Sequence, residues 1–208
     1  MIRVIIVDDH PVVRRGVRQI ITAEQDMQVA GEAVNAEEAL RVVRQTPCDA
    51  LLLDINLPDT SGFDVLKQLK HECPNLPVLI MSFHEEEPFA RQALKAGASG
   101  YLMKDSVPEE LIKAIRKISS GGRYISQSFA EILASGPASS EAPLHEKLSD
   151  REFQIMCHIA AGKSLKEIGR NLCISEKTVS TYRSRILEKM KIYTNSGLTR
   201  YALENKLI

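Results

Sequence analysis

The sequence predicts an α/β fold, a five-stranded doubly wound parallel sheet, joined to a second, smaller all-α domain of four helices. Up to about residue 120, short apolar runs alternate with amphipathic segments, which is typical of βαβ units with right-handed crossovers. After residue 147 the signals are short and helical. Between them lies a stretch rich in Ser, Gly, Ala and Pro, which is typical of a linker. We therefore expect one domain over 1–121, a linker over 122–146 and a second domain over 147–208.

The apolar runs of the first domain predict its strands, and the amphipathic segments between them predict its helices. Strands are expected at 3–7, 27–33, 49–53, 77–82 and 100–103, and helices at 12–22, 36–45, 62–72, 86–96 and 107–119. Val4-Ile5-Ile6-Val7 and Leu51-Leu52-Leu53 are continuously apolar because the inside of a parallel sheet is buried on both faces. Pro11 is an N1-type proline opening the first helix, and Gly97 supplies the left-handed residue that ends the fourth.

Helix N-cap signals divide the second domain. Ser149-x-x-Glu152 and Ser164-x-x-Glu167 have the form of capping boxes, and Ser175 is a third N-cap. Helices are expected near 150–161, 165–172, 176–191 and 195–204, while residues 126–134 in the linker allow one more short helix. The two middle helices, joined by Cys173-Ile174-Ser175, have the proportions of a helix-turn-helix.

The longer helix of this pair has an apolar and a polar side. Residues at spacings of three and four are expected to be buried, namely Val179, Tyr182, Ile186 and Met190. The polar residues include types that bind phosphates and read base edges, namely Lys177, Thr178, Ser180, Thr181, Ser184, Arg185 and Lys189. Residues 148–208 carry 11 basic against 6 acidic side chains, and residues 1–123 carry 15 against 18. The C-terminal end is thus the candidate polyanion binder, and the alternative is a solvated helix face.

Three acidic residues follow the two most apolar strands. Asp8 and Asp9 come directly after the first run, and Asp54 after the third strand. The crevice beyond the carboxyl ends of parallel strands is where ligands bind in such folds. Three carboxylates that converge there repel one another unless a cation joins them, and Mg²⁺ prefers oxygen ligands. Taken singly, each of these residues is better interpreted as a loop-end acid or a helix N-cap.

Other residue types exclude some classes of protein. Four cysteines lie far apart without a C-x-x-C pair, so we expect reduced thiols rather than a metal or disulfide site: Cys48, Cys73, Cys157 and Cys173. His10 is interpreted as a turn residue before Pro11.

No run of about 18 apolar residues occurs, and the amino terminus enters a strand directly without a signal-peptide pattern. We therefore expect a cytoplasmic protein without a membrane partner.

Together these motifs resemble a full-length response regulator of the NarL/FixJ type, with a receiver domain of flavodoxin-like fold and a LuxR-type helix-turn-helix. The receiver resemblance rests on motifs at successive strand ends, namely Val7-Asp8-Asp9-His10-Pro11, Leu53-Asp54-Ile55-Asn56-Leu57-Pro58, Met81-Ser82 and Gly100-Tyr101-Leu102-Met103-Lys104. The effector resemblance rests on Leu148-Ser149-x-Arg151-Glu152 and on segments 161–169 and 175–182.

The resemblance implies a phosphorylation site in the first domain. Asp54 would be the phosphoacceptor, and Lys104 would offset charge on the transferring group. Ser82 would hydrogen-bond the attached phosphoryl group, and Tyr101 would be the switch aromatic. The Mg²⁺ ligands implied by the resemblance are Asp9, Asp54 and the backbone carbonyl of Asn56, with Asp8 assisting.

Two residues depart from the pattern of many receivers. Asp105 follows Lys104 where a proline is common, so a proline-fixed cis peptide is not expected. Phe83 follows Ser82 where the residue is usually small, and its ring would narrow the access of a phosphodonor or water to the site.

The resemblance implies a two-component response regulator rather than an enzyme. A histidine kinase would phosphorylate Asp54, and phosphorylation would control homodimerisation through the last helix, around Leu198 to Leu203. It would thereby control sequence-specific binding to two promoter half-sites. An alternative is a phosphorylation-independent DNA-binding regulator in which Phe83 blocks modification and the receiver only dimerises. A third hypothesis is a Mg²⁺-dependent phosphatase or hydrolase; the small sheet, the lack of a D-x-D pair and the lack of a substrate-binding cap argue against it.

Overall fold

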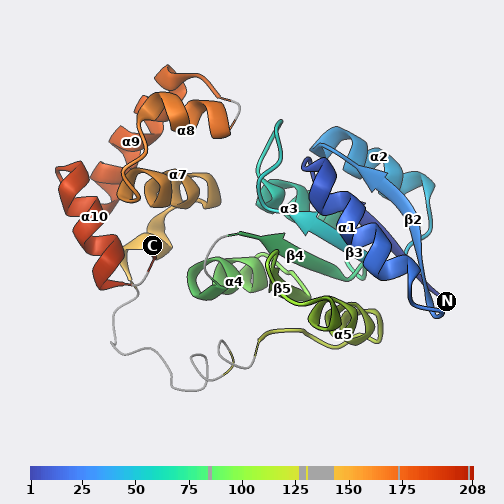
Figure 1. The fold of residues 1–208 in the computed structure, drawn as a ribbon. Coiled ribbons are helices and arrows are strands. Elements are labelled where there is room, and N and C mark those ends of the chain that lie inside the picture. Colours follow the sequence, from blue (N-terminus) through green and yellow to red (C-terminus); the bar gives the residue numbers. More distant parts are fainter. Residues whose placement is uncertain (84–85, 127–129, 131–142, 173, 206) are drawn as a thin grey trace. The chain divides into compact units, whose positions relative to one another are not determined.

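The computed structural model in Figure 1 describes residues 1–83, 86–126, 130, 143–172, 174–205 and 207–208. The chain divides into two compact units, Met1–Ile132 and Leu133–Ile208. Most of the short helix predicted over 126–134 lies outside the described residues, as does Cys173 in the predicted turn.

The first unit is built on a sheet whose neighbouring strands all run parallel. The strands are β1 (Ile2–Val7), β2 (Met27–Ala33), β3 (Ala50–Asp54), β4 (Val78–Ser82) and β5 (Gly100–Met103). Their order is β2-β1-β3-β4-β5, so the direction of winding reverses between β1 and β3. Ligands bind outside the carboxyl ends of the strands at such a reversal. The predicted five-stranded doubly wound fold is confirmed.

Helices cover both faces of this sheet because each inner strand is apolar on both sides. The helices are α1 (Pro11–Thr22), α2 (Ala36–Gln45), α3 (Gly62–Glu72), α4 (Glu86–Lys95) and α5 (Pro108–Ser119). Val4 and Ile6 belong to the core cluster that also contains residues of α1 and α5. Ile5 instead faces Gly31 of β2 together with Val42 of α2. Alternate residues of β1 therefore pack against helices on opposite faces.

The predicted helix-boundary residues have the predicted local roles. Pro11 lies in the first turn of α1, where its missing N–H costs no hydrogen bond. Gly97 follows α4 with a φ of 97°, a left-handed conformation that a side chain would strain.

The chain beyond α5 continues along the edge of the sheet. Tyr124 forms a parallel bridge with Gly100. Its N–H donates to the carbonyl of Ser99 at 2.9 Å, and the N–H of Tyr101 donates to the Tyr124 carbonyl at 3.3 Å. The first residues of the predicted linker are thus hydrogen-bonded to β5.

The second unit is helical, with η1 (Leu144–Lys147), α7 (Asp150–Ala160), α8 (Leu165–Asn171), α9 (Glu176–Met190) and α10 (Asn195–Glu204). Both predicted capping boxes are present, at the starts of α7 and α8, and Ser175 caps α9. The apolar side of α9 is buried as predicted at Val179, Ile186 and Met190. Tyr182 was predicted to be buried with them, but it is only partly buried because it borders an open depression at the amino-terminal half of α9.

No helix in the described part of the chain is both long enough and apolar enough to cross a membrane.

Replacement of Gly62 by alanine tests how closely α3 approaches β3. A Cβ atom at Gly62 would lie 2.1 Å from the backbone oxygen of Asp54, so the backbone must shift. We expect Gly62→Ala to destabilise the first unit by about 2–4 kcal/mol, measured by urea unfolding. The control is Gly16→Ala in α1, where nothing lies within 4 Å of the new Cβ. That variant should gain about 0.5–1 kcal/mol from helix propensity. Equal effects of the two substitutions would contradict this packing.

Candidate functional site

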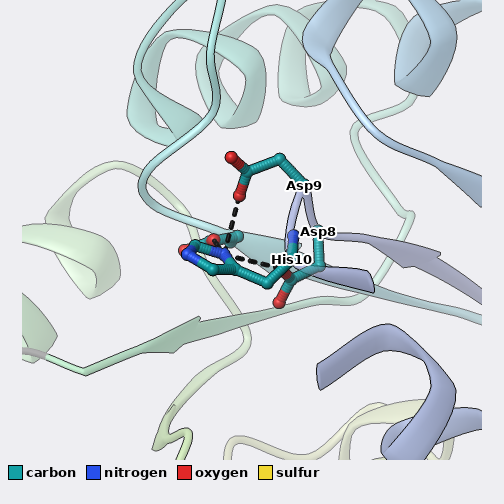
Figure 2. A group of neighbouring side chains, drawn as sticks. Asp8, Asp9 and His10 are labelled. Carbon is teal, nitrogen blue, oxygen red and sulfur yellow. Dashed lines mark hydrogen bonds and ion pairs between the residues drawn. The ribbon is translucent and has the colours of Figure 1, made fainter. Parts of the chain in front are cut away.

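Acidic side chains meet beyond the carboxyl ends of β1 and β3. Asp8 and Asp9 follow β1, and Asp54 is the last residue of β3. Asp8 and Asp54 are buried, whereas Asp9 is partly exposed. One ligand atom from each of these residues and from His10 lies within 4.8 Å of the others. Figure 2 shows Asp8, Asp9 and the His10 ring in this group. We call Asp8, Asp9 and Asp54 the acidic cluster.

Lys104, directly after β5, supplies a buried positive charge to the acidic cluster. Its Nζ atom lies 2.6 Å from Asp54 Oδ2 and 2.7 Å from Asp8 Oδ2. The Lys104 side chain is only 1% exposed. One ammonium group therefore joins residues from three different strand ends. With three carboxylates and one ammonium, the group keeps an excess of negative charge that suits a cation.

The environment of Asp54 changes its proton affinity. Burial raises the pKa of the Asp54 carboxyl to about 6, the Lys104 charge opposes this increase, and the Asp8 charge adds to it. A hydrogen bond from the Asn56 N–H to Asp54 Oδ1, 3.0 Å long, also favours the ionised form. Asp54 is thus a carboxylate at neutral pH that is poorly solvated, which is a suitable state for a nucleophile.

The loop after β3 is held at both of its ends. Asn56 and Ser61 form an antiparallel bridge across the loop. Between them, the carboxylate of Asp59 accepts hydrogen bonds from the N–H groups of Ala36 and Glu37 at the start of α2, at 2.9 and 3.2 Å. The position of Asn56 beside the acidic cluster is therefore supported by contacts with a second helix.

Ser82 and Tyr101 occupy neighbouring strands next to Lys104. Ser82 is the last residue of β4 and Tyr101 is the second of β5, and both are fully buried. The Lys104 N–H donates to the Ser82 carbonyl at 2.8 Å. Ser82 thus lies at the same edge of the sheet as Asp54 and Lys104, whereas Tyr101 lies two residues further back, paired with Ile80.

Two aromatic rings lie at the solvent side of these charges. Phe83 is 57% exposed, and Lys104 Nζ lies 5.1 Å from the centroid of its ring. The His10 ring meets the Phe83 ring edge to face, with 6.2 Å between centroids. His10 was read from the sequence as a turn residue only. It does occupy the N-cap position of α1, but its ring also joins the acidic cluster, and its place directly after two aspartates is the signal that pointed there.

The amino-terminal half of α9 presents its polar side chains to solvent. A depression of about 320 Å³ is lined by Ser175, Lys177, Thr178, Thr181, Tyr182 and Arg185. Ser180 and Ser184 are also exposed, and the Ser184 hydroxyl donates to the Ser180 carbonyl. Among the described residues, six of the seven predicted DNA-contacting side chains form no ion pair with an acidic group, and Lys189 is the exception.

Lys189 differs from the rest of this set. Its Nζ atom lies 2.6 Å from Glu152 Oε2, and Glu152 also closes the capping box of α7. The structure thus places Lys189 in a contact between α9 and α7 rather than with Lys177 and Arg185.

Both units match known families. A model of the response regulator receiver domain matches residues 4–116, and a model of bacterial regulatory proteins of the luxR family matches residues 146–202. The chain is 35% identical over its whole length to the response regulator UvrY of Escherichia coli and covers 96% of that protein.

Solved structures agree with this match. A LuxR-family two-component response regulator from an Aurantimonas species is 37% identical, with a TM-score of 0.61, over 65% of this chain and 96% of that one. RcsB of Salmonella enterica serovar Typhimurium, bound to a promoter in the presence of a phosphomimetic, is similar in fold, with a TM-score of 0.67 and 24% identity over 96% of this chain and 97% of that one.

The raised pKa of Asp54 predicts a pH-dependent cost in stability. Because the folded-state pKa is above the unfolded value, the folded protein binds the proton more tightly, so stability falls as the pH rises from about 4 to about 6 and stays reduced above that. We expect Asp54→Asn to stabilise the metal-free first unit at pH 7.5 by on the order of 1–3 kcal/mol, since Asp8 still pairs with Lys104.

Urea unfolding in a chelating buffer measures this difference. The gain should shrink as the pH falls and be nearly absent at about pH 3, below both the folded-state and the unfolded-state pKa of Asp54. Asp64→Asn, which removes an exposed carboxylate of α3, is the control and should change stability little at either pH. A gain of the same size at both pH values would contradict the assignment.

Proposed function

This chain belongs to the two-component response regulators that join a receiver domain to a LuxR-type DNA-binding domain, and we propose that phosphorylation of Asp54 controls its binding to promoter DNA. The observation that carries the proposal is the buried pairing of Asp54 with Lys104 beside Asp8, at the edge of a parallel sheet. We propose that the receiver domain covers 1–121, the linker 122–146 and the DNA-binding domain 147–208.

A phosphohistidine of a histidine kinase partner is the proposed donor. A carboxylate oxygen of Asp54 attacks the phosphorus, the phosphorus–nitrogen bond of the donor breaks, and the electron pair of that bond returns to the imidazole, which takes up a proton. The Lys104 ammonium is already within 2.6 Å of Asp54 Oδ2 and offsets the charge of the arriving phosphoryl group. Ser82, at the neighbouring strand end, is proposed to donate its hydroxyl hydrogen to that group.

The acidic cluster fits the Mg²⁺ that receiver domains typically bind. Its ligands are carboxylate oxygens, and one of them, Asp9 Oδ1, is buried without accepting a hydrogen bond. We propose Asp8, Asp9, Asp54 and the backbone carbonyl of Asn56 as the residues that hold the ion. When bound, Mg²⁺ would supply positive charge to the transferring phosphoryl oxygens.

Tyr101 is proposed to convert phosphorylation into a change at the surface. Its ring is buried in the present structure, on the strand that ends next to Lys104. A hydrogen bond from the Ser82 hydroxyl to the phosphoryl group would change the contacts around β4 and β5. Because the buried Tyr101 ring has few alternative positions, such a change would move it from one discrete position to another.

Pairing of two DNA-binding domains is the proposed output. On α10, Leu198 and Ala202 are buried inside their own domain, whereas Leu203 is 60% exposed. Pairing through the predicted segment Leu198 to Leu203 would therefore use Leu203 and leave Leu198 in the core. Two linked domains on adjacent half-sites gain affinity from their effective concentration.

The amino-terminal half of α9 is proposed to enter the major groove. Lys177, Thr178, Ser180, Thr181, Ser184 and Arg185 are its proposed contacts, and Lys189 is assigned the contact with Glu152. RcsB, which shares the fold, has been solved with a promoter.

A second candidate function follows from Phe83. Its ring covers the Lys104 ammonium and meets the His10 ring, so it stands on the solvent side of Asp54. If this ring excludes phosphodonors, the protein binds DNA without phosphorylation and the receiver serves only for dimerisation. Absence of a shifted band in phosphate-affinity electrophoresis of the wild type after acetyl phosphate treatment would select this candidate.

Removal of the phosphoacceptor tests the main proposal. After acetyl phosphate treatment, the wild type should give a shifted band in phosphate-affinity electrophoresis and bind promoter fragments more tightly. Asp54→Ala should give neither change, whereas the control Asp64→Asn should behave as the wild type does. An Asp54→Ala variant that binds as tightly as the treated wild type would overturn the proposed switch.

Removal of a basic side chain from α9 tests the DNA interface. Lys177→Ala should weaken binding to all promoter sequences and reduce the slope of log K against log salt by about 1, because one phosphate contact is lost. Its phosphorylation should stay normal. Lys113→Ala, which removes an exposed charge of the receiver helix α5, is the matched control. If both variants lower the slope equally, α9 is not the binding element.

A further inference from the structure

Two cysteines line one cavity at the edge of the sheet opposite the acidic cluster. Cys48 lies just before β3, and Cys73 is the C-cap residue of α3. The cavity has a volume of about 640 Å³, and both cysteines are partly buried in its wall. In the part of the chain that the structure describes, Cys48, Cys73 and Cys157 are free thiols. The fold thus brings two thiols that are far apart in the sequence to the same solvent-accessible space.

The charges of the two thiols act on each other. Burial raises the pKa of the Cys48 thiol to about 11, and the charges of Asp49 and Cys73 add to this increase. A charge acts in this way only over a short range in a solvated cavity, so the two sulfur atoms are neighbours. Cys157 differs, because it is only 4% exposed and belongs to the second unit.

Each of these two cysteines is next to a residue held by an ion pair. Before the second cysteine, Glu72 accepts hydrogen bonds from the Arg44 guanidinium at 2.6 and 2.8 Å. After the first, Asp49 accepts hydrogen bonds from the Arg3 guanidinium at 2.8 and 3.0 Å. Exposed pairs add little stability, but paired hydrogen bonds of this kind fix direction. The loops that carry the two thiols are therefore anchored beside the cavity.

We propose that Cys48 and Cys73 are a redox-sensitive pair that hydrogen peroxide oxidises to a reversible disulfide. The Cys73 thiolate attacks one peroxide oxygen, the oxygen–oxygen bond breaks, and the departing hydroxide takes up a proton to leave as water. The resulting sulfenic acid is attacked by the Cys48 sulfur. The sulfur–oxygen bond then breaks, and a second water leaves with the Cys48 proton. Two thiols lose two electrons and the peroxide gains them, and a dithiol reductant reverses the reaction.

The charges around the cavity determine which thiol attacks first. The pKa of Arg44 is raised mainly by Glu72 and to a smaller extent by Cys73, so this guanidinium lies near the Cys73 sulfur. A neighbouring positive charge favours the reactive thiolate. Cys48 instead adjoins the Asp49 carboxylate, whose effect on the Cys48 pKa exceeds the opposing effect of Arg3. Cys73 is therefore the attacking residue, and Cys48 is the residue that closes the bridge.

The bridge would add a second input to the receiver domain, separate from phosphorylation. It would close a loop that contains β3, Asp54 and α3. A covalent loop of this length stabilises a fold chiefly by restricting the unfolded chain. In a reducing compartment such disulfides are usually transient and serve to sense oxidants.

Peptide mapping of the full chain tests the proposal. The reduced wild type is treated with hydrogen peroxide, digested without reductant and analysed by mass spectrometry. We expect a peptide that links Cys48 to Cys73, with a mass lower by two hydrogen atoms, which dithiothreitol separates again. The midpoint of urea unfolding should rise on oxidation and return on reduction. Cys157→Ser, which removes the buried thiol, is the control and should form the same bridge.

Single variants test the order of attack. Cys48→Ser should accumulate a sulfenic acid on Cys73 that dimedone traps, whereas Cys73→Ser should be labelled far less. Equal labelling of the two variants would contradict the assigned order. Absence of the linked peptide from the oxidised wild type, or a bridge to another cysteine or between two chains, would overturn the pair itself. Asp54→Ala should form the bridge as the wild type does, so failure of the proposed phosphorylation switch would be seen separately.

Discussion

The contact of Lys104 with Asp54 and Asp8 is the interaction on which the proposed chemistry of the first unit depends. One ammonium, 1% exposed, joins carboxylates that follow β1 and β3 to the end of β5. A buried pair of this kind loses much of its attraction to desolvation, so it is weak support for stability. Burial also raises the pKa of Asp54, which shows that ionised Asp54 is held at a cost. The pairing is better explained by the proposed function of the site. Because these buried charges are shielded from water, a phosphoryl group added to Asp54 or a cation bound beside it would change the contacts of Lys104 with both carboxylates.

The sequence was sufficient for the fold and for much of this site, and the reason is physical. Strands buried on both faces must be apolar throughout, so Val4 to Val7 and Leu51 to Leu53 are readable without any tertiary information. Parallel strands then bring their carboxyl ends to one edge, which places Asp8, Asp54 and Lys104 together once the strands are known. The same holds for capping boxes, since Ser149 and Glu152 interact within a single turn.

Contacts that depend on the direction of side chains in loops could not be predicted from the sequence pattern. His10 has a sufficient local explanation as the residue between a strand and Pro11, so nothing in the sequence demanded that its ring face the carboxylates. Asp59 reaches the start of α2 from a loop more than 20 residues away, and no periodicity carries that information. Tyr182 has the spacing of a buried residue on α9, but it borders an open depression and is only partly buried. Helical spacing alone therefore predicted its burial wrongly, because spacing does not show where the core ends.

The second unit limits how the proposed switch can work. Glu152 closes the start of α7 and binds Lys189 in the last turn of α9, while Val179 and Ile186 bury the apolar side of α9. The polar half of α9 is therefore presented on a helix anchored along its length, with little freedom to be reshaped. Because α9 is already ordered in each domain, little binding free energy can be gained by ordering it further. A surface of modest charge therefore gains affinity for DNA chiefly from a second linked copy. Control by phosphorylation should accordingly act on how many DNA-binding domains come together rather than on the shape of the helix that touches DNA.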